Sequence, residues 1–288
     1  MGAWKIARHL LVMFATVLAG AFVAAMLVRA APGFDSDVQQ LDGRLSHESV
    51  EALKAERAQN RNIVLFYFQF LRNAAHGDLG KSQSLGRPVR ELIAERLPVT
   101  LRLAGWGLLA GWAVATFLAL ASSLIRLFAV NAVIASLVGA LLCIPSAVLA
   151  LAFVFARAPA FLAIALVVFP KIFGYSRNLL SRAYEMPHIV TARAKGIGEW
   201  RVLLWHVLPV SGSQLIALSG ISVSLALGAA IPVEALCGIP GIGELAWQAA
   251  LGRDLPVLVT LAVIVTILTM AANSASDVFN DALGARSA

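Results

Sequence analysis

The sequence predicts an all-α integral membrane protein with six transmembrane helices. Of its 288 residues, 59% are hydrophobic and only 14% are charged. A soluble domain carries about 25% charged residues, so this chain has too little polar surface to cover a water-soluble globule. Its apolar residues are also grouped in runs close to the length of about 20 residues that a helix needs to cross a bilayer.

Six apolar runs are candidate spans. They cover residues 10–28, 98–120, 128–155, 159–173, 209–231 and 256–275. The first is long enough to span, and no clear A-x-A cleavage site follows it, so we expect no cleavable signal peptide. The fourth is short, and the Lys171 side chain near its end can extend its amine to the membrane interface.

The basic residues predict the orientation of the chain, because cytoplasmic loops are enriched in Lys and Arg. With six spans, the basic residues before the first span, in the turn after the second and in the connection before the fifth fall on one side with the C-terminal tail. We therefore expect both termini to be cytoplasmic, and the net charge of +7 needs no nucleic-acid partner. The residues are Lys5, Arg8, Arg126, Arg177, Arg182, Arg193, Lys195 and Arg201.

The segment over residues 29–97 also contains many basic residues, yet this orientation places it outside the cell. Long loops are translocated largely regardless of their charge. We expect a small, mostly helical periplasmic segment, in which the run over residues 63–71 is too short to span and packs on the membrane surface or on the bundle. The predicted division is an N-terminal tail with the first span (1–28), this segment (29–97) and a membrane core (98–288).

Small residues at helical spacing form two seams along which helix backbones could approach closely in lipid. Such seams fit either a subunit interface that slides or static packing inside one chain. A polar stripe on the fifth span fits either a pore lining or interhelical hydrogen bonds. The seams comprise Gly107, Gly111 and Ala115 in the second span and Gly220, Ser224 and Gly228 in the fifth, and the stripe comprises Ser211, Gln214, Leu218 and Ser222.

The connection before the fifth span carries the most specific signal. Residues 191–196 read T-A-R-A-K-G, and His206 follows ten residues after Gly196. A helix that ends at Gly196 and a second helix that starts near Glu199 would form an elbow, because glycine accepts a positive φ without a Cβ clash. The elbow could dock as a basic knob in a groove of a soluble partner, or it could be an ordinary basic loop.

This pattern resembles the EAA-type coupling loop of ATP-binding-cassette importer permeases, and it is closest to their dipeptide, oligopeptide and nickel branch. Other segments also resemble patterns of that branch. They are G-D-L-G-x-S over residues 77–82, R-L-P-x-T-L over 96–101, E-x-x-F-x-x-P-G-x-G over 234–243, R-D-Y-P over 253–256, and N-x-x-x-D at Asn273 and Asp277.

The resemblance implies a type I importer permease fold in a bacterial inner membrane. The implied partners are a second homologous permease, two cytoplasmic ATPase subunits that hold ATP and Mg, and a periplasmic substrate-binding protein; no cofactor is expected on this chain. An ATPase-coupling loop lies within residues 175–207 and comprises Thr191, Ala192, Arg193, Ala194, Lys195, Gly196 and His206. An external gate or loop comprises Glu234, Pro240, Gly241, Gly243, Arg253, Asp254 and Pro256.

Several departures from the branch pattern leave the substrate open. Val190 stands at the position of the glutamate that names the motif, Cys237 replaces a phenylalanine, and the connection near Arg157 is short. These changes do not affect the expected fold. Peptides are favoured by the branch resemblance alone, while nickel, opines and glycosides stay open.

An enzymatic role is not expected. No catalytic cluster or metal-ligand spacing appears, and a lone histidine such as His206 is expected to be a structural hydrogen-bonder. Residues 75–82, A-H-G-D-L-G-K-S, satisfy a relaxed phosphate-loop pattern, but the sequence predicts neither the buried strand before it nor the helix after it that such a loop requires.

The main alternative is a secondary transporter driven by an ion gradient. That class favours ionisable residues at mid-membrane, and the spans here contain almost no carboxylates. A charged side chain at the bilayer centre costs about 2.5–3.5 kcal/mol. We therefore expect Glu234 at a membrane edge or in a wet vestibule, either as part of an outer gate or as a surface carboxylate.

Overall fold

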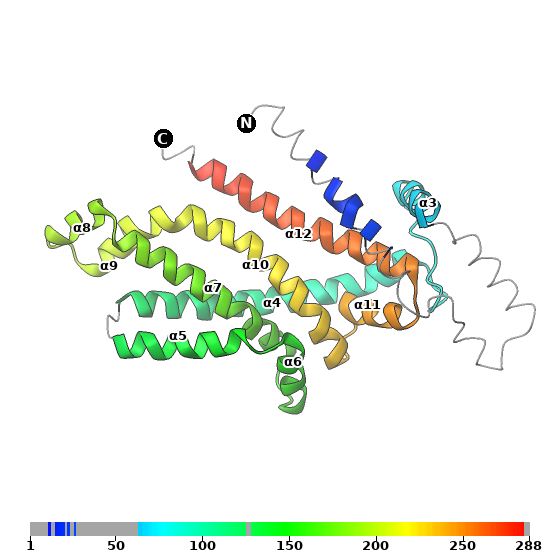
Figure 1. Ribbon diagram of the computed structural model, residues 1–288, viewed down its shortest axis with the longest axis horizontal. Helices are drawn as coiled ribbons and strands as arrows, with labels where there is room; N and C mark the ends of the chain where they lie inside the picture. Colours follow the sequence, from blue (N-terminus) through cyan, green and yellow to red (C-terminus); the bar gives the residue numbers. More distant parts are fainter. Residues whose placement is uncertain are drawn as a thin grey trace, which may run out of the picture. The chain divides into compact units, whose positions relative to one another are not determined.

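The computed structural model describes residues 11–12, 15–20, 22–23, 26, 63–124 and 128–284, and most of these residues are helical. Lys5, Arg8, Arg126, residues 29–62 and part of the predicted first span lie outside this description. From Ile63 onward the helices follow in chain order, and Figure 1 labels the α-helices among them. They are α3 (Ile63–Ala75), α4 (Val89–Leu124), α5 (Phe128–Leu142), α6 (Ser146–Phe155), α7 (Ala160–Tyr184), α8 (Pro187–Ala194), α9 (Glu199–Val202), the π-helix η2 (Leu203–Val207), α10 (Leu208–Cys237), α11 (Ile242–Leu251) and α12 (Leu255–Gly284).

The chain divides into two compact units. The first comprises Met1–Arg96 and Leu245–Ile267, and the second comprises Leu97–Glu244 and Leu268–Ala288. Each unit therefore combines segments that are far apart in the sequence. The predicted division at residues 28 and 97 stays a prediction.

Four described helices are long and apolar enough to cross a membrane, namely Val89–Ser123, Ala160–Tyr184, Glu199–Cys237 and Leu255–Asn280. Three of them contain the predicted second, fifth and sixth spans, which are confirmed as long apolar helices. The described residues of the predicted first span are helical. The total of six spans stays a prediction.

The predicted fourth span is longer than its apolar run. The run ends near Phe173, but α7 continues to Tyr184 through Ser, Arg and Asn residues. The sequence suggested that Lys171 lies near the end of the fourth span. In the structure it lies inside α7. The reason is that a change in hydropathy marks a change of surroundings and does not by itself end a helix.

The predicted third span is wrong as a single helix. Asn131–Leu142 and Ser146–Phe155 are bent by 95° at a short break, so the pair is either one broken span or a re-entrant segment. The break falls at Ile144 and Pro145. Proline disfavours helical backbone in the residue before it, and Pro145 itself is extended with φ −60° and ψ 142°. A hydropathy run alone could not show this bend.

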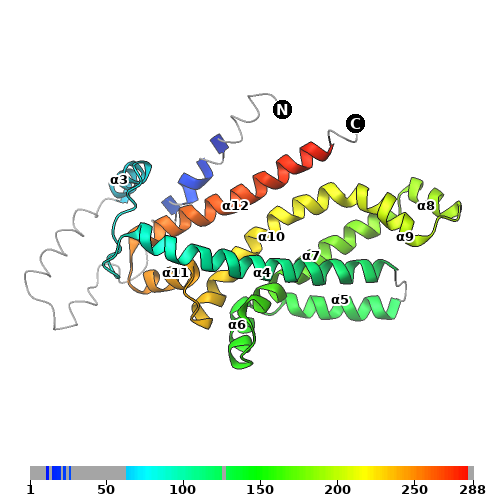
Figure 2. The same cartoon turned by 180° about the vertical axis from the view of Figure 1, so that it is seen from behind.

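Helix α7 forms the centre of the second unit. It lies between α5 and α10 in both views (Figures 1 and 2) and packs against both of them and against α6. Ile164, Val168 and Ile172 on this helix are fully buried. In lipid, the association of helices depends on close packing rather than on apolar burial. How closely the neighbouring helices approach α7 therefore matters more than how hydrophobic their surfaces are.

Glycines of α4 provide one of these close surfaces. A Cβ atom at Gly107 would lie 2.7 Å from the Cβ of Ile164, and one at Gly111 would lie 3.3 Å from the carbonyl oxygen of Ala165. A Cβ at Gly220 of α10 would lie 2.6 Å from the Oγ of Ser276. Packing inside one chain is therefore confirmed at these three positions.

The second seam does not pack inside the chain at its other end, where a subunit interface stays a prediction. A Cβ atom at Gly228 would meet nothing within 4 Å, and this residue is exposed. Equal spacing on a helix brings residues to one face, but the partner helix follows that face over a limited length only.

In the first unit, α3 packs on the bundle and not merely on a membrane surface. Tyr67 and Phe70 are buried together with Val259. The Tyr67 hydroxyl donates to the carbonyl oxygen of Leu18 at 2.6 Å, and its ring meets Phe22 edge-on with 5.5 Å between centroids. The bundle alternative for residues 63–71 is thus confirmed.

We predict that Gly107→Leu destabilises the protein while Gly105→Leu does not. A side chain at Gly107 would overlap Ile164, whereas a Cβ at Gly105 meets nothing within 4 Å. Overpacking of this kind costs about 1–3 kcal/mol. Thermal unfolding of the two purified variants in detergent measures the difference, and equal transition temperatures would contradict the packing described for α4 and α7.

Candidate functional site

The predicted elbow is confirmed in its backbone. Helix α8 ends at Ala194, Gly196 has φ +77°, and α9 begins at Glu199. The Gly196 N–H donates to the carbonyl oxygen of Arg193 at 2.9 Å, and the Ile197 N–H donates to that of Ala192 at 3.3 Å. These two bonds form a Schellman motif, which satisfies the last carbonyls of a helix and requires a left-handed residue. The elbow therefore has a defined shape.

Arg193 braces the elbow from inside. Its guanidinium forms an ion pair with Glu199 at 2.7 Å across the turn and lies 4.8 Å above the ring centroid of Tyr184 at the end of α7. Ile189 and Ala192 of α8 are buried beneath it. The sequence suggested a basic knob, and this arginine of the knob is turned partly inward because an ion pair and an aromatic face are available there.

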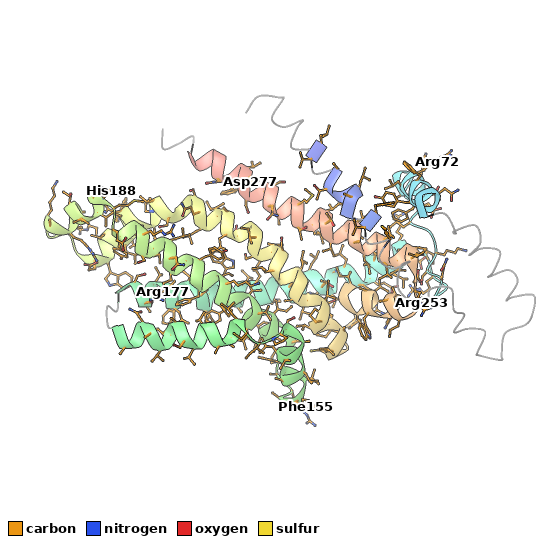
Figure 3. The ribbon with its side chains drawn as sticks, in the orientation of Figure 1. Arg72, Phe155, Arg177, His188, Arg253 and Asp277 are labelled. Carbon is orange, nitrogen blue, oxygen red and sulfur yellow. The ribbon has the colours of Figure 1, made fainter. Side chains whose placement is uncertain are left out.

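The outward surface of the elbow is mixed in character. Thr191, Ala194 and Lys195 are exposed, as is Val190 at 52% of its surface. The Thr191 hydroxyl donates to the carbonyl oxygen of Pro187, so it reinforces α8 and remains at the surface. Figure 3 shows His188 on the same short helix at the end of the second unit. This surface offers small, apolar and cationic contacts to a partner.

His206 lies in a feature that sequence reasoning missed. Residues Leu203–Val207 form a π-helix that leads directly into α10. The widened turn precedes Pro209, which has no N–H to donate to the carbonyl four residues earlier. His206 is half-buried, and its Nδ1 atom has no hydrogen-bond partner among the described residues. The expectation that His206 is a structural hydrogen-bonder is thus not supported at this atom.

A buried carboxylate holds the loop after α10. Gly238, with φ +62°, ends the helix, and the chain returns so that the Gly243 N–H donates to the Glu234 Oε2 atom at 2.6 Å. The Glu234 side chain is fully buried, which excludes the interpretation as a surface carboxylate. The Thr100 hydroxyl accepts the Ile242 N–H at 2.8 Å and fixes the same loop from α4.

This carboxylate explains two glycines of the loop. A Cβ atom at Gly241 would overlap the Glu234 carboxylate, and one at Gly243 would lie 2.9 Å from its Oε2 atom and 2.5 Å from the Cα of Ile231. Pro240, which precedes both glycines, is exposed. The spacing of the E-x-x-F-x-x-P-G-x-G pattern therefore has a steric cause: the loop can close over the glutamate only where side chains are absent.

A second buried carboxylate organises the first unit. The Asp254 Oδ2 atom accepts hydrogen bonds from the Ser82 hydroxyl at 2.6 Å and from the Ser84 N–H and hydroxyl at 3.0 and 2.9 Å. Its Oδ1 atom accepts the Val257 N–H at 3.3 Å and so caps the first turn of α12, where Pro256 also lies. Arg253 precedes it in a left-handed turn with φ +52°.

This contact joins two motifs that the sequence presented separately. Ser82 ends the G-D-L-G-x-S pattern, and Asp254 belongs to the R-D-x-P pattern. No local signal pairs them, because they lie 172 residues apart. The phosphate-loop resemblance also loses its basis here: α3 precedes the segment, the Ser82 hydroxyl is bound to Asp254, and the next helix begins only at Val89.

The polar stripe of α10 is mostly enclosed. Ser211, Leu218 and Ser222 are buried, while Gln214 is exposed. The Ser222 hydroxyl accepts the Trp112 indole N–H at 2.9 Å, which is an interhelical hydrogen bond inside the second unit. Pore lining by this stripe stays a prediction.

A cavity lies beside the stripe on α10, where its lining residues Leu215, Ser219 and Val223 each follow a stripe residue by one position. It has a volume of about 590 Å³, and residues of α4, α10 and the second-unit part of α12 line it. Leu215, Ser219 and Val223 contribute one helix face, opposite Trp112 and Ala272. The sequence could not predict this cavity, because its lining is largely apolar and apolar residues at helical spacing are equally typical of helix packing.

We predict that Gly241→Ala destabilises the protein and that Glu234→Ala removes most of this cost. The added methyl group would overlap the carboxylate, so the two substitutions should be non-additive by about 0.5–3 kcal/mol. Unfolding of both single variants and of the double variant measures the coupling. Gly228→Ala, at a position with open space, is the control. Additive effects would contradict the close contact between Gly241 and the Glu234 carboxylate.

The sequence matches the family model described as "Binding-protein-dependent transport system inner membrane component" over residues 99–288. A putative peptide transport system permease protein of Brucella suis is 29% identical over 286 residues, which is 90% of each chain. The oligopeptide transport system permease protein AppB of Bacillus subtilis is 26% identical over 313 residues and 95% of each chain. OppB of Escherichia coli is 26% identical over 85% of this chain and 86% of its own.

The arrangement of helices is also similar to that of a solved structure. An inward-facing structure of the MetNI methionine ABC transporter contains a chain that matches with a TM-score of 0.60 and 19% sequence identity, over 67% of this chain and 97% of that one. At this identity the likeness concerns the fold, and it supports a type I importer arrangement of the helices.

Proposed function

This chain belongs to the family of binding-protein-dependent transport system inner membrane components, and on that premise we propose that its elbow is the point where an ATPase drives it. The chain is a permease subunit of an ATP-binding-cassette importer, and it forms part of the path through the membrane. We propose that a second homologous permease completes this path and that two cytoplasmic ATPase subunits hold the ATP and Mg.

The observation that carries the coupling proposal is the Schellman closure at Gly196. A surface that transmits force must keep its shape. The shape of the elbow is fixed by two backbone hydrogen bonds and by the Arg193–Glu199 ion pair. Exposed Val190, Ala194 and Lys195 would enter a groove on the ATPase.

The elbow is also connected to the helices that would have to move. Tyr184 ends α7 just before α8, and η2 leads from α9 into α10 without a break. A displacement of the elbow would therefore act on two packed spans together. Closure of the ATPases would shift the bundle between inward-open and outward-open states, provided that the partners make different contacts in the two states.

We further propose a bacterial inner membrane location, with six spans and with the elbow and both termini in the cytoplasm. The positive-inside rule supports this orientation, because the elbow region contains Arg177, Arg182 and Lys195. The loop held by Glu234 would then lie at the external end of α10, where a periplasmic binding protein delivers substrate. The proposed external gate residues lie in this loop and in the turn before α12.

The proposed cargo is a peptide. Support comes from the relatives in Brucella suis, Bacillus subtilis and Escherichia coli, whose names refer to peptide or oligopeptide transport. Nickel, opines and glycosides remain alternatives within the branch, and uptake assays with a matched binding protein would separate them.

We predict that Gly196→Pro uncouples ATP hydrolysis from uptake. Proline fixes φ near −65° and lacks an N–H. It therefore cannot adopt the φ of +77° or donate a hydrogen bond to the Arg193 carbonyl oxygen. In proteoliposomes with the complete transporter, we expect uptake to fall at least tenfold while insertion of the chain is unchanged. Gly198→Ala is the control, because Gly198 has φ −60° and open space around it.

Normal uptake by the Gly196→Pro variant would reject the coupling role of the elbow. Crosslinking provides a second test. A photoreactive side chain at Lys195 should capture an ATPase subunit, whereas one at exposed Phe155, which Figure 3 labels on α6, should not.

A further inference from the structure

A polar cavity of about 280 Å³ lies next to the elbow in the second unit. It is formed where the end of α4, the start of α5, the last turns of α7 and helix α8 meet. Its lining is rich in hydroxyl and guanidinium groups and comprises Ser122, Ser123, Asn131, Arg177, Ser181, Tyr184, Glu185 and Arg193. Neither the coupling surface nor the loop at Glu234 uses this cavity.

The charges of this lining are incompletely matched. Arg177, which Figure 3 labels on α7, is half-buried and has no hydrogen-bond or ion-pair partner among the described residues. Arg193 is paired with Glu199 through one terminal nitrogen, but its buried Nε atom has no partner there. The buried Tyr184 hydroxyl also lacks one. Glu185 is the carboxylate in the lining, and it is exposed at the end of α7.

We propose that this cavity binds a phosphate-type anion, supplied either as free phosphate or as the headgroup of an anionic lipid. Guanidinium groups present forked N–H donors that match phosphate oxygens. The Ser122 and Ser123 hydroxyls already donate to the Asn131 Oδ1 atom and to the Ala119 carbonyl oxygen. The Ser181 and Tyr184 hydroxyls are therefore the neutral donors that the lining can add. Ligand cavities typically measure about 300–1,000 Å³, so this one suits a phosphate or a small headgroup and not a nucleotide.

The position of the cavity adds a consequence, which rests on the proposed coupling function. Arg193 both lines the cavity and ties α8 to α9 through Glu199. A bound phosphate would compete with the Glu199 carboxylate for this guanidinium. Anion binding and the position of the elbow would then be linked, and each would affect the other equally.

The test uses the full-length chain in phosphatidylcholine nanodiscs, without any ATPase. One arm titrates inorganic phosphate against chloride at equal ionic strength. The other replaces part of the lipid by phosphatidylglycerol in a phosphate-free buffer. The midpoint of thermal unfolding reports binding, because a ligand that binds only the folded state stabilises it. Phosphate should raise the midpoint if the free anion binds, and phosphatidylglycerol alone should raise it if the headgroup is the source.

Two matched variants assign the effect to the cavity. Arg177→Gln should weaken anion binding about tenfold, because a charge-assisted contact is lost. Arg182→Gln removes the same charge from an exposed position of the same helix outside the lining, and it should respond like the unchanged protein. The proposal is overturned if neither anion stabilises the unchanged protein or if the two variants respond alike.

A third variant keeps the proposal testable if Arg177→Gln does not fold. Glu185→Gln removes a negative charge from the lining, so it should strengthen phosphate binding several-fold. An unchanged affinity would count against the site. Because all of these measurements use the chain alone, their failure would leave the docking of the elbow on an ATPase untouched, and uptake by Gly196→Pro tests that role separately.

Discussion

The structure depends on one constraint: inside a bilayer, each backbone N–H and C=O group must find its partner within the protein. Helices meet this requirement inside the bilayer, and where a helix ends near the membrane surface its last backbone groups also need partners. The elbow uses the Schellman bonds at Gly196, and the end of α10 uses Gly238 with a bond from Ile239 to the Glu234 carbonyl oxygen. At the bend, Pro145 has no N–H group, so one donor fewer needs a partner there.

Buried carboxylates perform the same task in the two loops at α11. Glu234 accepts the Gly243 N–H, and Asp254 accepts donors from Ser82, Ser84 and the first turn of α12. Each replaces water as the acceptor for backbone groups that no helix satisfies. This accounts for these two buried acidic residues in an apolar chain.

In the elbow, the residues that hold the shape differ from the residues that are exposed to a partner. Arg193 and Ile189 hold the shape from inside, while Val190 and Lys195 are left for a partner. A short loop can transmit force only if it does not deform first. The ion pair, the cation–π contact and the two backbone hydrogen bonds resist deformation together. Because η2 continues directly into α10, a displacement of the elbow would be transmitted to that helix.

The sequence by itself determined the membrane class, three of the long apolar helices and the elbow. These features depend on local properties, namely the length of an apolar run and the positive φ that only glycine adopts readily, as at Gly196. The tertiary structure alone decided that Ser82 meets Asp254, that Glu234 is buried beneath a glycine loop, and that Arg193 faces inward. Such contacts join segments that are distant in sequence or depend on which face of a helix its neighbours cover, and no local pattern contains that information.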